Sequence, residues 1–266
     1  MAVAELGFAL GGEAALPPDF PTRRGPLVFC RAAELAQAKP GDETVQWLGR
    51  FNVVFTNGYG LASPPVLAEL QSRGTAVFLY FWTNGFVAAE LERNLPDGRW
   101  RNELLARHPD WLLSPSPLEG PPGTPESYYF DFGQPELLDF LCEQLAAFRA
   151  QTGYDGYFFD YAGVYALPKA VVALWEQRHP GLPYDRAVLR FLERLREVSP
   201  EVLIFTNQAY RSTEPLLAAV DFDLMESAAT SYAWGPTTEV DGEQRAETFF
   251  RPWEGPGGLR EVHARI

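Results

Sequence analysis

The stretch Gly153-Tyr-Asp-Gly-Tyr-Phe-Phe-Asp-Tyr-Ala-Gly-Val-Tyr165 decides how the rest of the chain is interpreted. Residues 156–160 predict a short buried strand, because a compact apolar and aromatic run is bounded by glycine and follows a helical pattern. The run ends on Asp160. Parallel α/β folds carry their chemistry at the carboxyl ends of the strands, so Asp160 is a candidate site residue. The alternative is that Asp160 only caps the loop that follows.

Length and charge narrow the fold and the partners. The chain has 266 residues, of which 46% are hydrophobic, and this suits a single α/β barrel domain over residues 1–266. The net charge is −13, from 22 Lys and Arg against 35 Asp and Glu, so we expect no nucleic-acid partner. A neutral or cationic ligand suits such a chain better. Aromatic residues make up 14%, and they either fill a core, as we expect of most of them, or provide flat surfaces that stack on sugars or bases.

Several other kinds of site are not indicated. Cys30 and Cys142 are interpreted as buried thiols rather than as a disulfide or zinc site. The chain lacks a pair of histidines at metal-binding spacing, a Gly-x-Ser-x-Gly elbow and a phosphate-binding glycine loop. We expect no cofactor and no metal, although carboxylates at Asp131, Asp160 and Glu226 leave a magnesium site open as an alternative. No signal peptide or membrane span is visible, so a cytoplasmic location is the default, and a processed N-terminus would indicate secretion.

The chain reads as six successive strand and helix units. The expected strands span residues 27–30, 51–56, 75–82, 156–160, 202–206 and 222–226. The expected helices span residues 32–48 (interrupted near Pro40), 64–73, 135–152, 168–177, 185–198, 213–220 and 257–266. Residues 84–132 form a long insertion with a helix near residues 101–107, which we interpret as a wall or lid over the site. Residues 227–234 are expected to be a loop, and Asp241-Gly242 a hairpin turn.

Two of these strands end on carboxylates, Asp160 and Glu226. Alternating strands and helices would bring both ends around one cavity, which is the arrangement that glycoside hydrolysis requires. One carboxyl group protonates the leaving oxygen, and the other attacks the sugar or activates water. The alternative is that both carboxylates are structural strand ends paired with Arg or Lys.

A further set of polar and aromatic residues lies at or just past expected strand ends. Their flat rings could stack on sugars, and their amides or carboxylates could bind hydroxyl groups. The expected substrate-binding residues are Tyr59, Tyr80, Trp82, Asp131, Asn207, Gln208 and Trp234. We expect them to converge on one concavity with Asp160.

Five phrases occur in this order along the chain: His108-Pro-Asp-Trp-Leu112, Phe130-Asp-Phe-Gly-Gln-Pro-Glu136, Tyr154-Asp-Gly-Tyr-Phe-Phe-Asp160, Phe205-Thr-Asn-Gln208 and Phe222-Asp-Leu-Met-Glu-Ser227. Over roughly residues 26–234 they resemble the glycoside-hydrolase-like barrels of family 114, endo-α-1,4-polygalactosaminidases, and their relatives. The resemblance implies a TIM-type (β/α)8 barrel and a retaining glycosidase for an amino-sugar or related polysaccharide. It also implies Asp160 as nucleophile and Glu226 as general acid/base. The alternative is a catalytically inactive barrel that binds carbohydrate.

The C-terminal part departs from that family, because no seventh or eighth strand is visible. A barrel that stops after six strands leaves backbone groups unpaired at both edges of its sheet. We expect one of three remedies: a closing strand from residues 2–10 or 244–250, a covering subunit, or a longer natural chain. The sequence favours the first or the third. An uncovered gap would favour association of copies through the first and sixth strands, while the oligomeric state itself is left open.

Overall fold

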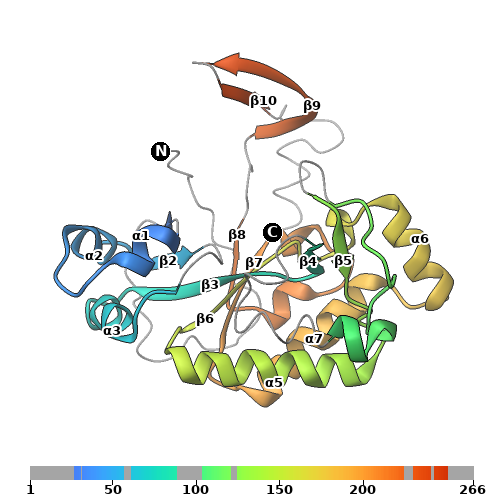
Figure 1. Cartoon of the computed structure of the whole chain (residues 1–266), viewed down its shortest axis with the longest axis horizontal. Coiled ribbons are helices and arrows are strands. Elements are labelled where there is room, and N and C mark those ends of the chain that lie inside the picture. Colours follow the sequence, from blue (N-terminus) through green and yellow to red (C-terminus); the bar gives the residue numbers. More distant parts are fainter. Residues whose placement is uncertain are drawn as a thin grey trace.

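The computed structural model describes residues 27–30, 32–56, 61–88, 104–120, 125–224, 230–240 and 243–250. Its centre is a six-stranded parallel sheet with the strand order β1-β2-β3-β6-β7-β8, curled into a half-barrel (Figure 1). The strands are β1 (Leu27–Cys30), β2 (Val53–Thr56), β3 (Ala76–Trp82), β6 (Gly156–Asp160), β7 (Leu203–Asn207) and β8 (Phe222–Leu224). The six-strand prediction is therefore confirmed, and within the described ranges the barrel is incomplete, as expected.

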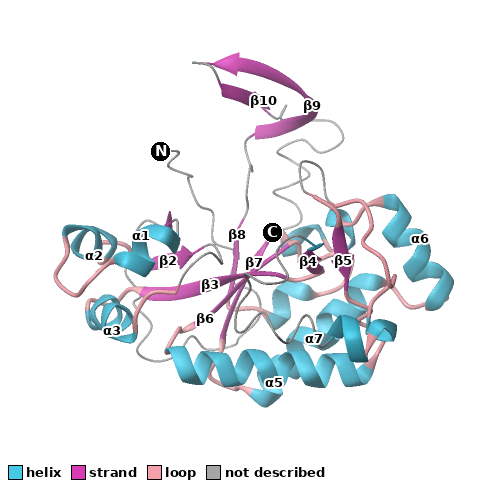
Figure 2. Cartoon of the chain, in the orientation of Figure 1, coloured by secondary structure: helices cyan, strands magenta, loops and turns pink. Residues whose placement is uncertain are grey.

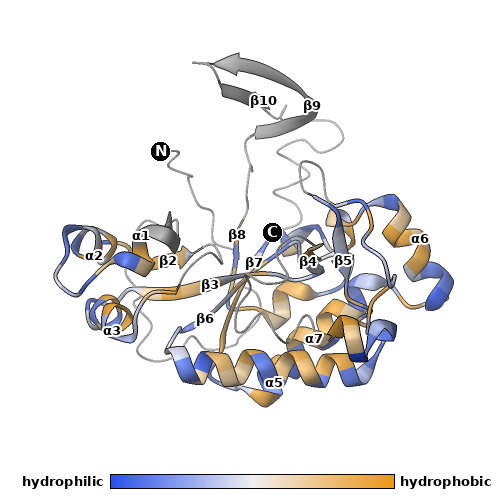
Figure 3. Cartoon of the chain, viewed as in Figure 1, coloured by the Kyte–Doolittle hydropathy of each residue, from blue (hydrophilic) through white to orange (hydrophobic). Residues whose placement is uncertain are grey.

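Helices cover one face of this sheet. They are α1 (Ala32–Gln37), α2 (Glu43–Leu48), α3 (Pro64–Ser72), α5 (Pro135–Thr152), α6 (Lys169–Arg178) and α7 (Tyr184–Val198). The break predicted near Pro40 separates α1 from α2, and α5 has the predicted bounds because Pro135 begins it and Gly153, at φ 84°, ends it. Figure 3 shows hydrophobic residues along β3 and on α5 and α7, with hydrophilic residues at the outer turns of α6.

The helix predicted over residues 213–220 is shorter in the structure. A 3-10 helix, η5 (Leu216–Ala219), is all that forms there. Pro215 precedes it and cannot donate a backbone hydrogen bond, and Asp221 two residues beyond is already tied to β7 through the Ile204 N–H. The chain after β7 therefore returns to the sheet through short turns instead of a full helix.

Alternation along the strands sorts the core into two layers. The layer toward the helices holds Val54, Val77, Phe159 and Ile204 together with the apolar sides of α3, α5 and α7. The face turned away from the helices, which we call the inner face, is dominated by phenylalanine. Its rings come from Phe55, Phe78, Phe158, Phe205 and Phe222, and neighbouring ring centroids lie 4.4 to 6.0 Å apart. Inner-face residues thus point toward the barrel axis.

The insertion after β3 is more ordered than the sequence suggested. Strands β4 (Gly85–Val87) and β5 (Ser127–Tyr129) pair antiparallel, and the 3-10 helix η2 (Pro109–Trp111) lies between them in sequence. Residues 104–107 are helical, in agreement with the predicted helix end. Gly85 is needed at this pairing, because a Cβ there would lie 2.0 Å from the Tyr128 carbonyl oxygen. The described part of the insertion is therefore anchored to the domain.

The predicted hairpin is present near the C-terminal end. Strands β9 (Thr230–Val240) and β10 (Glu243–Phe250) pair antiparallel around residues 241–242 (Figure 2). Residues 230–234, expected to be loop, belong to β9. The suggestion that residues 244–250 close the barrel is wrong, because their strand partner is β9 and the two form a separate sheet. The alternative closing segment, residues 2–10, and the helix expected over residues 257–266 lie outside the described residues.

Cys30 ends β1, and Cys142 is fully buried in α5. Burial raises the pKa of the Cys142 thiol to about 12, so the group stays protonated. This agrees with its predicted role as a buried thiol. No helix within the described ranges is long and apolar enough to cross a membrane.

Candidate active site

Asp160 is the last residue of β6 and lies at the carboxyl end of the sheet. Phe158, two residues earlier, belongs to the inner face, so alternation directs Asp160 toward that face as well. The side chain is partly exposed, unlike the four strand residues before it. Asp160 is the one charged residue of the otherwise apolar and aromatic strand GYFFD, and the chain leaves the sheet directly after it.

Among the described residues, three groups donate hydrogen bonds to the Asp160 carboxylate. The Tyr80 hydroxyl donates to Oδ2 at 2.8 Å, the Asn207 side-chain amide donates to Oδ1 at 2.9 Å, and the backbone N–H of Tyr161 donates to Oδ1 at 2.9 Å. Tyr80 belongs to β3 and Asn207 ends β7, the two strands on either side of β6. Hydrogen bonds to a carboxylate stabilise its charged form over the neutral acid. The arrangement therefore favours an ionised, oriented Asp160.

The backbone is unusual directly after this carboxylate. Tyr161, which follows Asp160, has φ 56°, and Gln208, which follows Asn207, has φ 62°. Among the described residues these are the two non-glycine positions with left-handed backbone. Such conformations cost of order 1 kcal/mol each and are concentrated at functional sites. Two neighbouring strands thus end in the same way, with a polar side chain followed by a strained turn.

Tyr165 supports the site from the loop after β6. Its hydroxyl donates to the backbone carbonyl of Asn207, and the Arg211 guanidinium lies 4.9 Å from the centre of its ring. Burial, followed by the nearby Asp160 and Asp223 carboxylates, raises the pKa of Tyr165 well above its usual value. The hydroxyl is therefore a permanent donor, and it fixes the residue that binds Asp160.

The remaining expected site residues are placed as follows. Trp82 is the register partner of Asp160 in β3, and its ring packs edge-on against Tyr129 and Tyr161. Gln208 accepts a hydrogen bond from Arg211 at 2.8 Å. Tyr59 and Glu226 lie outside the described residues, and so does the side chain of Trp234 in β9. Within the described part, the structure brings Asp160, Tyr80, Asn207 and Trp82 to one end of the sheet.

Asp131 is placed differently from these residues. Its side chain is fully buried, with Oδ1 2.6 Å from His179 Nε2 and Oδ2 3.0 Å from Arg178 Nη1. It also accepts the Gly133 N–H at 3.1 Å. These contacts tie the start of α5 to the end of α6. Its carboxylate is therefore not presented to solvent as a substrate-binding group would be, because it is buried and already bound by internal donors, which include the Gln134 side-chain amide at 3.5 Å.

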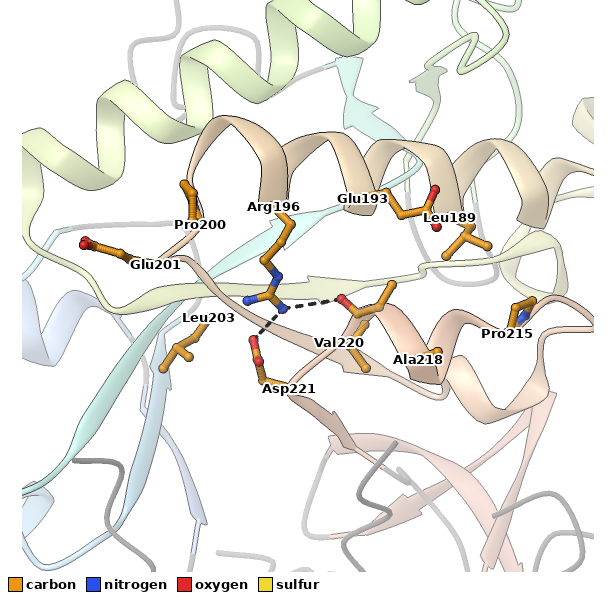
Figure 4. Close-up of a pocket in the computed structure, with 11 residues that line it drawn as sticks. Leu189, Glu193, Arg196, Pro200, Glu201, Leu203, Pro215, Ala218, Val220 and Asp221 are labelled. Carbon is orange, nitrogen blue, oxygen red and sulfur yellow. Dashed lines mark hydrogen bonds and ion pairs between the residues drawn. The ribbon is translucent and has the colours of Figure 1, made fainter. Parts of the chain in front are cut away.

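The structure also has a cavity of about 520 Å³ at the opposite, amino end of the sheet. It lies between α7 and η5, and Arg196 crosses it to pair with Asp221 at 2.8 Å (Figure 4). The residues that donate to Asp160, namely Tyr80, Tyr161 and Asn207, are not among its lining residues. We place the candidate site at the carboxyl end because the oriented Asp160 carboxylate lies there, although the cavity lies at the amino end. No cluster of three or more metal-ligating side chains is found within the described ranges.

Comparison with known proteins places this fold. No protein-family model and no curated protein matches the chain. The glycoside hydrolase domain of PelA from Pseudomonas aeruginosa is similar at 20% identity and a TM-score of 0.54, over 83% of this chain and 72% of that one. A variant of that domain is 19% identical with a TM-score of 0.53, again over 83% of this chain and 72% of that one. Aspergillus fumigatus Ega3 in complex with galactosamine is 11% identical with a TM-score of 0.49, and the match covers 80% of this chain and 70% of that one. The similarity to the PelA domain shows that the chain has the fold of a glycoside hydrolase domain, as the sequence resemblance implies.

Proposed function

We propose that this chain is a glycoside hydrolase that cleaves a polysaccharide or oligosaccharide by a two-carboxylate mechanism. The observation that carries the proposal is Asp160, held on the inner face at the carboxyl end of β6 by donors from both neighbouring strands. The fold supports it, because catalytic groups of such barrels sit at the carboxyl ends of strands. One fold can host many different reactions, so the proposed activity rests on the residues of the site.

Asp160 is proposed as the nucleophile. In retaining glycosidases one carboxylate attacks the anomeric carbon as an anion while the other protonates the leaving oxygen. Three donors on Asp160 favour the anion and fix its direction. A general acid would need the opposite environment, with the neutral carboxyl group favoured. The geometry around Asp160 therefore suits attack or charge stabilisation better than proton donation.

Glu226 is proposed as the general acid/base. It follows the last described residue of β8, Leu224, by two positions. The Glu-Ser phrase at this point is part of the family resemblance. The proposed substrate class, a polysaccharide containing amino sugars, comes from the same resemblance and agrees with the net charge of −13, which suits a neutral or cationic ligand.

The proposed binding surface around Asp160 uses aromatic and amide groups. Trp82, beside Asp160, and Tyr59 and Trp234 are proposed to contact sugar rings, and Gln208 to bind a hydroxyl group. Asp131 is left out, because Arg178 and His179 occupy its carboxylate.

The test is a panel of defined oligosaccharides, including neutral, N-acetylated amino-sugar and deacetylated amino-sugar chains, assayed for binding and for new reducing ends. We expect the protein to release reducing ends from at least one of them. Asp160→Asn and Glu226→Gln should each lower kcat about 1000-fold or more while binding persists. Binding without release by the unaltered chain, or near-normal release by both variants, contradicts the proposal.

A further inference from the structure

Asp185 lies at the start of α7 and is almost fully buried. Its Oδ1 accepts the backbone N–H of Val164 at 2.6 Å, and its Oδ2 accepts the hydroxyl of Ser212 at 2.6 Å. Val164 belongs to the loop after β6, and Ser212 ends the turn after β7. One carboxylate therefore joins the loops that follow two adjacent strands, and both strands end in site residues.

The two loops contact each other beside Asp160. Tyr165, next to Val164, donates its hydroxyl to the Asn207 carbonyl, and Arg211, next to Ser212, covers the Tyr165 ring. Asn207 in turn donates to Asp160 at 2.9 Å. Gly163 is closely packed in this arrangement, since a Cβ there would lie 2.7 Å from the Tyr165 ring. The contacts thus form a continuous path from Asp185 to the Asp160 carboxylate.

We propose that Asp185 is a positioning residue for Asp160: it locks the loops after β6 and β7 together, so that Tyr165 fixes Asn207 and Asn207 orients the carboxylate. Its importance for turnover rests on the proposed function, whereas its effect on Asn207 does not. A small misplacement of a reacting group lowers rates strongly, by as much as 100-fold for a shift of about 1 Å.

The competing explanation is that Asp185 only stabilises the fold. An acidic side chain in the first turn of a helix interacts favourably with the helix dipole, wherever the active site lies. Both of the hydrogen bonds that Asp185 makes, however, go to loops that carry site residues. A purely structural residue should lower stability without altering kcat per folded molecule.

Asp221 provides the matched control. It too is a buried aspartate that accepts a backbone N–H, from Ile204 at 2.7 Å, and binds a second side chain, Arg196, but it lies at the amino end of the sheet. With a cleaved member of the oligosaccharide panel, Asp185→Ala should lower kcat by about 10- to 100-fold with little change in KM. Asp221→Ala should leave both constants unchanged per folded molecule. Asp185→Asn, which retains an acceptor and an amide for Ser212, should recover most of kcat.

A second measurement needs no substrate. The side-chain amide of Asn207 is followed by ¹H–¹⁵N NMR of the full chain and assigned from its absence in Asn207→Ala. We expect its signal to shift in Asp185→Ala and in Tyr165→Phe, which leaves Asp185 in place, and to stay unchanged in Asp221→Ala. An unchanged Asn207 signal in both Asp185→Ala and Tyr165→Phe overturns the inference, as does an equal loss of kcat in Asp185→Ala and Asp221→Ala. Failure to cleave any oligosaccharide overturns the proposed function and leaves the NMR result to decide the role of Asp185.

Discussion

The two ends of the six-stranded sheet use the same residue type in different ways. At the amino end, Asp155 accepts the N–H of Val77 at 2.7 Å, and Asp221 accepts the N–H of Ile204 at 2.7 Å. Each precedes one strand and binds the start of the neighbouring strand. At the carboxyl end, Asp160 is bound by side chains from β3 and β7 and stays partly exposed. Carboxylates at the amino end therefore join strands, while Asp160 is held in place and presented.

The left-handed backbone positions differ between the ends as well. Before β3 and β6 the chain turns at Gly74 and Gly153, where a positive φ costs little. After β6 and β7 it turns at Tyr161 and Gln208, where the same conformation is unfavourable. Barrel enzymes separate stability from chemistry in this way, with function at the carboxyl end. The variants below test that separation.

The largest expected effect on stability comes from Asp221→Ala. The variant removes the carboxylate that accepts from the Arg196 guanidinium and from the buried Ile204 N–H. Arg196 keeps the Val202 and Ala219 carbonyls, but leaving the buried N–H without its charged partner typically costs about 2 to 3 kcal/mol. Asp160→Ala should cost less, about 1 kcal/mol of the free energy of unfolding, because Asp160, Tyr80 and Tyr161 are partly exposed and water can replace part of the lost hydrogen bonding. Urea denaturation of both variants measures this difference. A larger loss in Asp160→Ala would show that the carboxyl end also supports the fold.

Asp223, on the helix-facing side of β8, should make stability depend on pH. Burial raises the pKa of its carboxyl group to about 6, against hydrogen bonds from Ala209, Thr206 and Tyr210 that lower it. An unfolded aspartate titrates near about 4, so the native state binds more protons between these values. Stability is therefore greatest below about pH 4 for this group and falls as pH rises through about 6, by up to about 3 kcal/mol.

The measurement is denaturation from pH 4 to pH 7 for the unaltered chain and for Asp223→Asn, which cannot titrate. We expect the difference between the two curves to change across this window and to level off above it. Parallel curves would mean that Asp223 is already ionised at pH 4 in the native state.

Tyr80→Phe tests the carboxyl end by a smaller change, and we expect it to affect activity more than stability. It removes the hydroxyl that donates to Asp160 Oδ2, and a hydrogen bond to a charged group is worth about 1.5–3 kcal/mol. We expect kcat/KM to fall about 10-fold or more, with the fold retained. The control is Tyr157→Phe in β6, whose hydroxyl donates to the Leu145 carbonyl on the helix side. A comparable loss of kcat/KM in the control would attribute the effect to packing rather than to Asp160.

The smallest expected effects concern backbone strain. Gln208→Gly relieves a left-handed residue and should raise the free energy of unfolding by about 1 kcal/mol, while a looser Asn207 lowers kcat a fewfold. Gly153→Ala at the amino end should lower stability by about 1 kcal/mol and leave kcat unchanged, because φ there is 84° and no atom lies within 4 Å of a new Cβ. Thermal melting and initial rates test both. Faster turnover in Gln208→Gly would mean that the strain serves no purpose at the site.

Much of the sheet was predictable because its strands are short apolar runs bounded by glycine and proline. Residues 156–160 and 135–152 were predicted at the residue level, since Gly153 ends one element and Gly156 begins the next. Strands β4 and β5 were missed, because three-residue strands in a segment rich in proline and glycine have no readable period. The hairpin turn at residues 241–242 was predicted, but residues 230–234 of β9 were expected to be loop, because their mixture of polar and aromatic residues shows no clear strand period.

The site was predictable only at its strand ends. Asp160, Tyr80 and Asn207 were selected because each lies at the end of a strand pattern, and the structure places them in contact. Asp185 was missed, because in the sequence it looks like any acidic residue in the first turn of an amphipathic helix. The same limit applies to Asp131, whose burial depends on Arg178 and His179, 47 and 48 residues further along.

The aspartates at the amino end also bear on how the chain tolerates its long insertion. The bond from Asp155 to Val77 closes 78 residues, and the bond from Asp221 to Ile204 closes 17. Closure entropy grows only with the logarithm of loop length, so the longer closure costs about 1.4 kcal/mol more. One buried carboxylate bound to a strand can offset a difference of that size. The length of the segment between β3 and β6 therefore has little effect on the free energy of folding. Evolution can lengthen or shorten this segment with little effect on the register of the sheet.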